Sequence, residues 1–168
     1  VIGGSDQKGL NQCTELYESF DCEKIITDSN SSQMIKYLSN TYLAMRLSFV
    51  NETYRLVSEF NGNPEEVLNA IGKDKRIGND YFRPSPGWGG SCFPKDVKEV
   101  ISSFQMDYQL PIISEILRSN ELHMAWFVDY ILKIINEQSF ENIVLIGAPF
   151  KENTDDLRES PSLKIYKL

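Results

Sequence analysis

The residues with the clearest capacity for chemistry lie in residues 87–96, which read Gly-Trp-Gly-Gly-Ser-Cys-Phe-Pro-Lys-Asp. The glycines lack a Cβ and permit positive φ, so the backbone can take a tight path and let another molecule approach Cys92. Pro94 suits the first turn of a helix, and apolar residues recur behind it at positions 97, 100, 101 and 104. We therefore expect Cys92 just before a helix N-terminus, where the dipole and the cation Lys95 favour the thiolate, which attacks carbonyl carbon. Asp96 is a candidate base.

Two less specific interpretations of this stretch stay open. A free cysteine is most often a small buried hydrophobic residue, and glycines beside aromatic residues also form ordinary loops. Packing alone does not require glycines, a helix start, a lysine and a carboxylate together, so the combination favours catalysis. The alternative for the whole chain is a helical dimerisation module in which Cys92 is inert.

Composition limits the partners of this chain. Its 24 acidic and 17 basic residues give a net charge of −7, which argues against nucleic acid held by phosphate neutralisation. Cys13, Cys22 and Cys92 form no close pair, and His123 is the single histidine, so neither a disulfide framework nor a metal site is indicated. We expect His123 to be structural or exposed. A reducing, cytoplasmic setting fits the three unpaired cysteines. No apolar run approaches the ~20 residues of a membrane span and no leader is visible, so we expect a soluble protein.

A long helix is the main element expected to position these residues. It begins near residues 28–32, where Asn30 and Gln33 have capping-box spacing, and it ends near residues 61–62. About 30 residues at 1.5 Å each span roughly 45 Å. Apolar residues form one stripe at positions 34, 38, 42, 45 and 49 and a second at 43, 47 and 50, so we expect burial on several sides.

Shorter elements surround the long helix. A helical pattern covers residues 11–20, and proline or N-cap residues open further helices over 64–72, from 94, and over 110–137. Residues 24–27 read as a short strand, and residues 143–147, Ile-Val-Leu-Ile-Gly, read as a buried parallel strand. The chain begins in a strand-like segment and ends inside a helical pattern, so we expect a fragment of a longer protein.

Residues 87–96 resemble the catalytic-cysteine signature of the UDP-glucose/GDP-mannose dehydrogenase family, whose nucleotide-sugar enzymes oxidise a primary alcohol to a carboxylate with two NAD. Residues 32–44 are similar to that family's central helix, residues 74–78 to its pre-loop segment, and residues 150–161 to the opening of its C-terminal domain. The resemblance runs in order along nearly the whole chain.

The resemblance implies a mainly α fold flanked by partial α/β, Rossmann-like pieces. Residues 1–28 would close an NAD-binding domain, whose Gly-x-Gly-x-x-Gly fingerprint does not occur here. Residues 29–139 would be the central helical dimerisation domain, whose long connecting helix packs against its twin in a homodimer. Residues 140–168 would begin a nucleotide-sugar-binding domain. The chain alone is therefore expected to be inactive.

The resemblance also implies roles for four catalytic residues. Cys92 would add to the aldehyde, and water activated near Asp96 would hydrolyse the resulting thioester. Lys36 would stabilise the oxyanion at the sugar carbon, and Asn40, four residues on and on the same helical face, would orient a water or hydroxyl. Without the resemblance Lys36 reads as a solvated surface lysine. Gln33 replaces the glutamate common at its position, a change that helix capping tolerates.

Both Lys36 and Asn40 are also expected to contact the substrate. Four further residues share this expectation: Arg76, Tyr81, Gly89 and Lys151. Arg76 would reach the substrate of the partner subunit, although residues 73–76 also read as an ordinary charged connector. Tyr81 would wall the site beside Gly89, with loop packing as the alternative. Lys151 would bind the nucleotide-sugar.

Cofactor contacts are expected from two cations, Lys95 and Arg158. Surface ion pairing is the plain alternative for Arg158, as it is for Lys151, because both stand among acidic residues. Trp88 replaces a smaller aromatic residue often found at its position, so the shape of the pocket stays open.

The implied reaction is the oxidation of UDP-glucose to UDP-glucuronate with two NAD. Residues 74–78 favour UDP-glucose, whereas residues 89–92 and 154–161 suit GDP-mannose equally well, and GDP-mannose oxidation is the alternative. The N-acetylmannosamine branch is disfavoured because Lys95 occupies a position where that branch usually departs from lysine.

Overall fold

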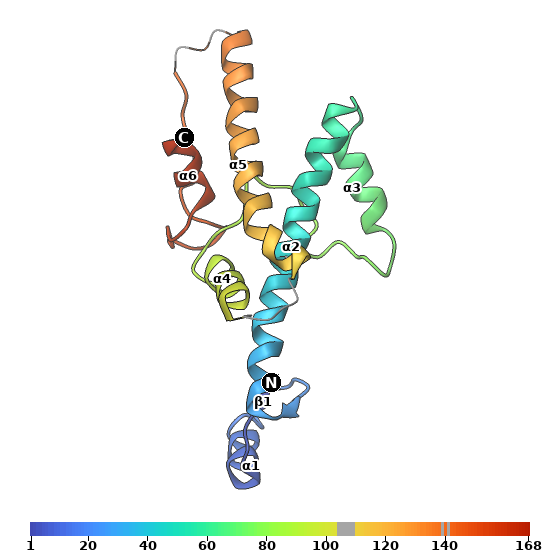
Figure 1. Cartoon of the computed structure of the whole chain (residues 1–168), viewed down its shortest axis with the longest axis vertical. Helices are drawn as coiled ribbons and strands as arrows, with labels where there is room; N and C mark the ends of the chain where they lie inside the picture. Colours follow the sequence, from blue (N-terminus) through green and yellow to red (C-terminus); the bar gives the residue numbers. More distant parts are fainter. Residues whose placement is uncertain (104–109, 139, 141) are drawn as a thin grey trace. The chain divides into compact units, whose positions relative to one another are not determined.

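The computed structural model describes residues 1–103, 110–138, 140 and 142–168, which fall into two compact units, residues 1–39 and 40–168 (Figure 1). In the first unit, β1 (Ile2–Gly3) and β2 (Ile26–Thr27) pair in parallel, and α1 (Gln7–Leu16) connects them. This β-α-β arrangement is the α/β piece expected at the start of the chain. The helix begins earlier than its apolar spacing predicts, because the Asp6 carboxylate caps it by accepting the Gly9 N–H at 2.7 Å.

The long helix α2 runs over Ser29–Glu59, close to the predicted bounds. Its N-cap is Asp28 rather than Asn30, because Oδ1 of Asp28 accepts the N–H of Ser31 at 2.9 Å. The hydrogen bonds from Ser31 lower the pKa of the Asp28 carboxyl below its usual value of 3.8. The capping-box prediction therefore located the N-terminus of the helix but named the wrong residue as its N-cap.

The face that α2 buries differs from the one that its large apolar residues predict. In the second unit the buried positions of α2 are Thr41, Ala44, Ser48, Val50 and Asn51. Tyr42 and Phe49 are each 54% exposed in this chain. The prediction that their stripe is buried is therefore wrong here, and the physical reason is closeness of packing: short side chains let neighbouring elements approach the helix.

The remaining helices belong to the second unit, which makes the described chain mainly α as predicted. They are α3 (Pro64–Gly72), α4 (Phe93–Ser103), α5 (Pro111–Gln138) and α6 (Pro161–Lys167). Figure 1 shows α4 and α6 beside α5, in agreement with their contacts. Residue 104, predicted to continue α4, lies outside the described residues.

Two apolar clusters hold the second unit together. One contains Ala44, Trp88, Val97 and Ile116, and the other contains Val50, Leu68 and Phe82. The first joins α2, α4 and α5 to the loop before α4, so the loop that carries Cys92 is built into the core. No helix among the described residues has both the length and the apolar character to cross a membrane.

The predicted strand over residues 143–147 is not formed. The segment has no assigned secondary structure, and Ile146 is 90% exposed. Its composition is that of a buried strand, but the described part of the second unit offers no strand with which its backbone could pair. The expected three-part division of the chain stays a prediction, and its boundary residue 139 lies outside the described residues.

Candidate functional site

Cys92 lies immediately before α4, where the sequence places it. Its carbonyl accepts the N–H of Asp96 at 2.8 Å, the first hydrogen bond of the helix. Its side chain is exposed, and Sγ lies 3.7 Å from Oγ of Ser91. A thiol at the N-terminal end of a helix, open to solvent, is free to react.

A cavity of about 310 Å³ opens over this thiol. It brings together four residues singled out from the sequence: Cys92, Tyr81, Gly89 and Lys151. The rest of its wall is Leu47, Ser85, Gly87, Trp88, Ser91, Phe93 and Phe150. Aromatic faces, one cation and a thiol suit a flat or ring-shaped ligand that carries negative charge.

Tyr81 supplies an aromatic ring to the cavity wall and Lys151 supplies a cation. Tyr81 has φ of 53°, a left-handed conformation that aromatic residues rarely adopt, and its ring lies 6.3 Å from that of Phe93. Such a conformation stores backbone strain, which concentrates at functional sites. Lys151 is exposed, and its Nζ lies 5.5 Å from the centre of the Phe150 ring.

The glycines of the loop serve contacts within the chain. A Cβ on Gly87 would meet Met124 of α5 at 2.8 Å, and one on Gly90 would meet the Phe150 ring at 2.6 Å. A Cβ on Gly89 would overlap the carbonyl of Glu159. These contacts give the glycines a structural role, since the neighbours that require glycine are α5 and residues 148–161. That glycine also lets another molecule approach Cys92 stays a prediction.

Trp88 is a core residue that also reaches the cavity. Its indole N–H donates to Oγ of Ser48 at 2.9 Å, and its ring meets that of Phe93 edge to face at 6.3 Å. These contacts are those of a residue that packs the loop against the core.

A second group of predicted residues surrounds the Asp96 carboxylate, which is completely buried. Oδ2 of Asp96 accepts from Nδ2 of Asn40 at 2.6 Å, and Oδ1 accepts from Nζ of Lys95 at 2.6 Å. Asp96 does not line the cavity, but its backbone bond to Cys92 ties it to the same turn of α4. The structure therefore joins Asn40 of α2 to the start of α4 through one buried carboxylate.

Arg158 lies within electrostatic reach of Cys92. Its guanidinium grips Asp156 through Nε and Nη2, the latter at 2.7 Å from Oδ2. This bond raises the pKa of Arg158 above its ordinary value, and the negative charge of an ionised Cys92 adds a smaller contribution. The same contact lowers the pKa of the Asp156 carboxyl to about 2. The pairing holds the Arg158 guanidinium in place.

Lys95 lines a groove of about 370 Å³ beside the same loop. The other residues of the groove are Gly90, Ser91, Pro94, Lys98, Glu99, Ser102 and Glu159. Its two ammonium groups and its hydroxyls form a donor set that fits a phosphate, in spite of the two carboxylates. Among the described residues, no three His, Cys, Asp or Glu side chains gather as metal ligands.

Two predicted site residues are not among those that line the cavity or the groove. Arg76 is 89% exposed and bonds Asp74 through Nη2 at 2.6 Å. This contact raises the pKa of Arg76 and lowers that of Asp74. Lys36 belongs to the first unit, on α2, with Nζ 4.9 Å from the centre of the Tyr37 ring. Their roles at the site stay predictions.

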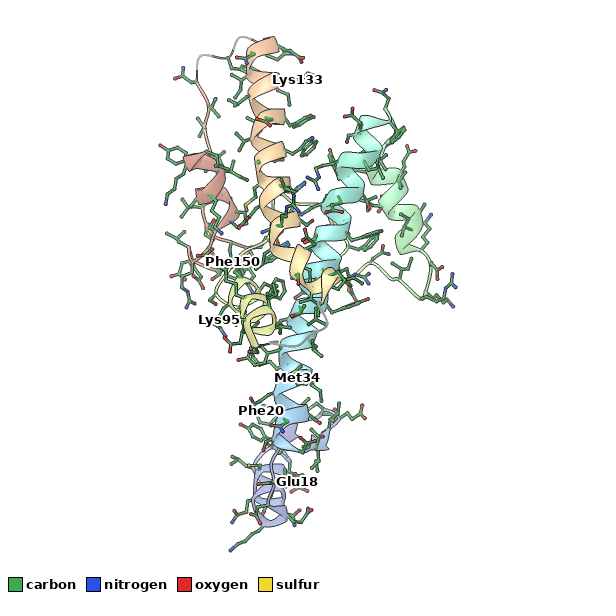
Figure 2. The ribbon with its side chains drawn as sticks, in the orientation of Figure 1. Glu18, Phe20, Met34, Lys95, Lys133 and Phe150 are labelled. Atoms are coloured by element: carbon green, nitrogen blue, oxygen red, sulfur yellow. The ribbon has the colours of Figure 1, made fainter. Side chains whose placement is uncertain are left out.

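Some cavity residues were not singled out from the sequence as site residues. Phe150 covers Gly90 and carries Lys151 on the next position, and Figure 2 shows it near α4, as it does Lys95. An aromatic residue directly before a candidate binding lysine was the available signal. Leu47 and Ser85 gave none, because one reads as ordinary helix core and the other as ordinary loop.

Known proteins are similar to this chain in sequence and in fold. Residues 30–122 match the central-domain model of the UDP-glucose/GDP-mannose dehydrogenase family. The chain is 36% identical over 166 residues to UDP-glucose 6-dehydrogenase YwqF of Bacillus subtilis, covering 98% of this chain and 38% of the relative.

Solved structures agree with these sequence matches. A UDP-glucose dehydrogenase of Pyrobaculum islandicum superposes with a TM-score of 0.85 at 31% identity, covering 98% of this chain and 38% of the other. A UDP-D-ManNAc dehydrogenase of Pyrococcus horikoshii gives 0.84 at 26% identity, covering 98% and 40%. The chain thus spans about two fifths of the length of these proteins. It belongs to the UDP-glucose/GDP-mannose dehydrogenase family, and more than half of it is that family's central domain.

Proposed function

We propose that the protein containing this chain oxidises UDP-glucose to UDP-glucuronate. The observation that carries the proposal is the Cys92 thiol, which opens at a helix start into a cavity shared with Lys151 and an aromatic wall. A relative that matches 98% of this chain is named a UDP-glucose 6-dehydrogenase, which supports UDP-glucose as the substrate.

The second oxidation would proceed through covalent intermediates on Cys92. After the alcohol is oxidised to an aldehyde, Sγ bonds to the aldehyde carbon and the oxygen takes a proton, giving a thiohemiacetal. Loss of a hydride and a proton from this adduct leaves a thioester. Water then adds to the carbonyl, the C–S bond breaks, and the thiolate leaves the carboxylate product. Covalent capture keeps the aldehyde in the site until it is oxidised.

NAD, when bound, accepts the hydride at each of the two oxidations. Lys95 and Arg158 would hold its anionic part. For Lys95 this role suits the groove beside α4, whose donor set fits a phosphate. Both cations are more than half exposed while paired with a carboxylate, so each can bind a second anion.

Lys36, Asn40 and Asp96 would manage charge and protons around the reacting carbon. Lys36 would stabilise the oxyanion, and the hydrolytic water would be activated near Asp96. Asn40 holds the Asp96 carboxylate through its amide, which fixes the direction in which that carboxylate faces. Arg76 and Tyr81 would contact the substrate, Arg76 from the partner subunit. The isolated 168-residue chain is proposed to be inactive.

The stoichiometry of NADH formation tests this proposal in the full-length protein. We expect two NADH per UDP-glucose. Cys92→Ala should abolish this stoichiometry, whereas the matched control Cys13→Ala, whose thiol is also exposed, should leave it unchanged. Turnover with GDP-mannose alone would keep the mechanism and overturn the substrate. No NADH with either sugar, with Cys92 inert to alkylation, would favour a helical dimerisation module.

The homodimer is proposed from the exposed side of α2. Tyr42, Phe49 and Leu56 are seven residues apart, large, apolar and exposed, which is the spacing of a helix seam that packs on another helix. We expect Phe49→Asp to shift the protein from dimer to monomer in sedimentation, whereas Ile112→Asp, at an exposed site of α5, leaves the dimer intact. A dimer unaffected by Phe49→Asp would contradict this interface.

A further inference from the structure

The loop that leads to Cys92 is held in place by side chains. Among the described residues, no backbone-to-backbone hydrogen bond outside helices and strands involves residues 79–91. Buried backbone groups need partners, and here α2 and α5 supply them. Asn51 accepts the N–H of Ser85 at 2.9 Å, and Nε2 of His123 donates to the carbonyl of Ser85 at 2.8 Å.

The second attachment point is Trp88, and Asn120 of α5 makes it. Oδ1 of Asn120 accepts the Trp88 N–H at 3.0 Å, and Nδ2 donates to the Trp88 carbonyl at 2.8 Å. One amide thus satisfies both backbone groups of one residue, as a neighbouring strand would. Asn120 is only 5% exposed, so no water competes for these bonds.

The attachment is transmitted toward the thiol by packing. The Trp88 indole is fixed by Ser48, and its ring meets Phe93, the residue that follows Cys92. Gly87 passes so close to Asn120 that a Cβ would lie 3.3 Å from its Oδ1. The backbone on both sides of Trp88 therefore has little freedom, and Cys92 lies four residues beyond the attachment.

We propose that Asn120 is a positioning residue for the Cys92 thiol, acting through the backbone of Trp88. Asn120 does not line the cavity, so it has no contact through which to bind a ligand there. The proposal rests on the function proposed above. Its consequence is specific: a thiol displaced from the aldehyde carbon captures it less often, so aldehyde escapes after the first oxidation.

The experiment compares Asn120→Ala with Asn136→Ala, an exposed asparagine on the same helix. In the full-length protein with UDP-glucose we expect Asn120→Ala to lower kcat roughly 10- to 100-fold, with KM within about twofold. NADH per sugar consumed should fall from two toward one, a ratio that a smaller folded fraction would not change. Asn136→Ala should match wild type in both.

Alkylation gives a readout that does not depend on activity. Iodoacetamide should label Cys92 several-fold more slowly in Asn120→Ala, while Cys13 in the same molecules keeps its rate. Unchanged labelling of Cys92, or two NADH per sugar at normal kcat, would overturn the role of Asn120. A wild-type protein that makes no NADH, with the labelling difference present, would overturn the reaction and keep the positioning role.

Urea unfolding shows whether Asn120→Ala is folded. If it is not, Asn120→Asp takes its place, because the carboxylate still accepts the Trp88 N–H, while its second oxygen replaces the donor to the Trp88 carbonyl. The expected direction of each readout is the same, and the same results would overturn the proposal.

Discussion

Replacing Gly89 with alanine tests whether the loop before Cys92 and residues 148–161 are packed as closely as the structure shows. A Cβ on Gly89 would overlap the Glu159 carbonyl, lie 2.9 Å from its carbon and lie 3.0 Å from Cδ of Pro161. Carbon atoms attract at about 3.5–4.0 Å, so the two segments must separate by at least about 0.5–1 Å. A peptide carbonyl and a proline ring are stiff, and neither can rotate away.

The expected cost follows from these contacts. Overpacking costs about 1–3 kcal/mol, and the upper half of that range applies where the neighbour is backbone. With a urea m-value of about 2 kcal/mol/M, a loss of about 2–3 kcal/mol lowers the unfolding midpoint by about 1–1.5 M. Gly78→Ala is the matched control, because Gly78 has φ of 70° and nothing within 4 Å of its Cβ position. Its strain costs about 1–2 kcal/mol without parting any segments.

Tryptophan fluorescence during urea unfolding is the assay, since Trp88 and Trp126 both lie in the second unit and report on it alone. Trypsin adds a local readout: cleavage after Lys151 should speed up in Gly89→Ala as its segment loosens, and stay at the wild-type rate in Gly78→Ala. The packing argument is refuted if Gly89→Ala unfolds at a higher urea concentration than Gly78→Ala while cleavage at Lys151 is unchanged.

Three further changes probe polar contacts of the second unit. Asn40→Leu removes a donor from the buried Asp96 carboxylate, and we expect a loss of about 1.5–3 kcal/mol in urea unfolding; no loss would mean that the bond is replaced. Trp88→Phe removes the donor to Ser48, and calorimetry should show a Tm lower by several degrees, at about 1–3 kcal/mol. Burial lowers the pKa of His123 below 6.5. Below pH 6.5, His123 therefore binds a proton more readily in the unfolded chain than in the folded chain, and the free energy of unfolding falls. Wild type should lose stability between pH 7 and 5 faster than His123→Gln, and parallel curves would contradict this.

Helix ends were the part of the fold best predicted from sequence, because caps are local. Asn63 and Pro64 open α3 as expected, with the Asn63 side chain accepting from Glu66 N–H at 3.3 Å. The strand at residues 143–147 failed because a strand depends on a neighbour, which no local pattern supplies. The buried face of α2 failed for a related reason: large apolar residues mark a face for burial, but not the chain that covers it.

In the site, too, features set by local sequence were predicted, and features that depend on packing between distant segments were not. Pro94 and the apolar spacing behind it were enough to place Cys92 before a helix, since both signals lie within one turn of it. The contact between Asn40 and Asp96 joins residues 56 apart in sequence, and only the packing of α2 against the start of α4 brings them together. Resemblance to a family selected both residues, but their hydrogen bond could not be derived from either local sequence.

The glycine pattern before Cys92 now carries less weight for function, and other features carry more. Gly87, Gly89 and Gly90 are each explained by a neighbour inside the chain, so an inert loop packed this tightly would need them too. What an inert loop does not need is an exposed thiol beneath a cavity that Lys151 also lines, with Arg158 close enough to sense its charge. Under the proposed function the tight packing would serve the reaction, because a nucleophile must be held still to meet a carbonyl carbon at bonding distance.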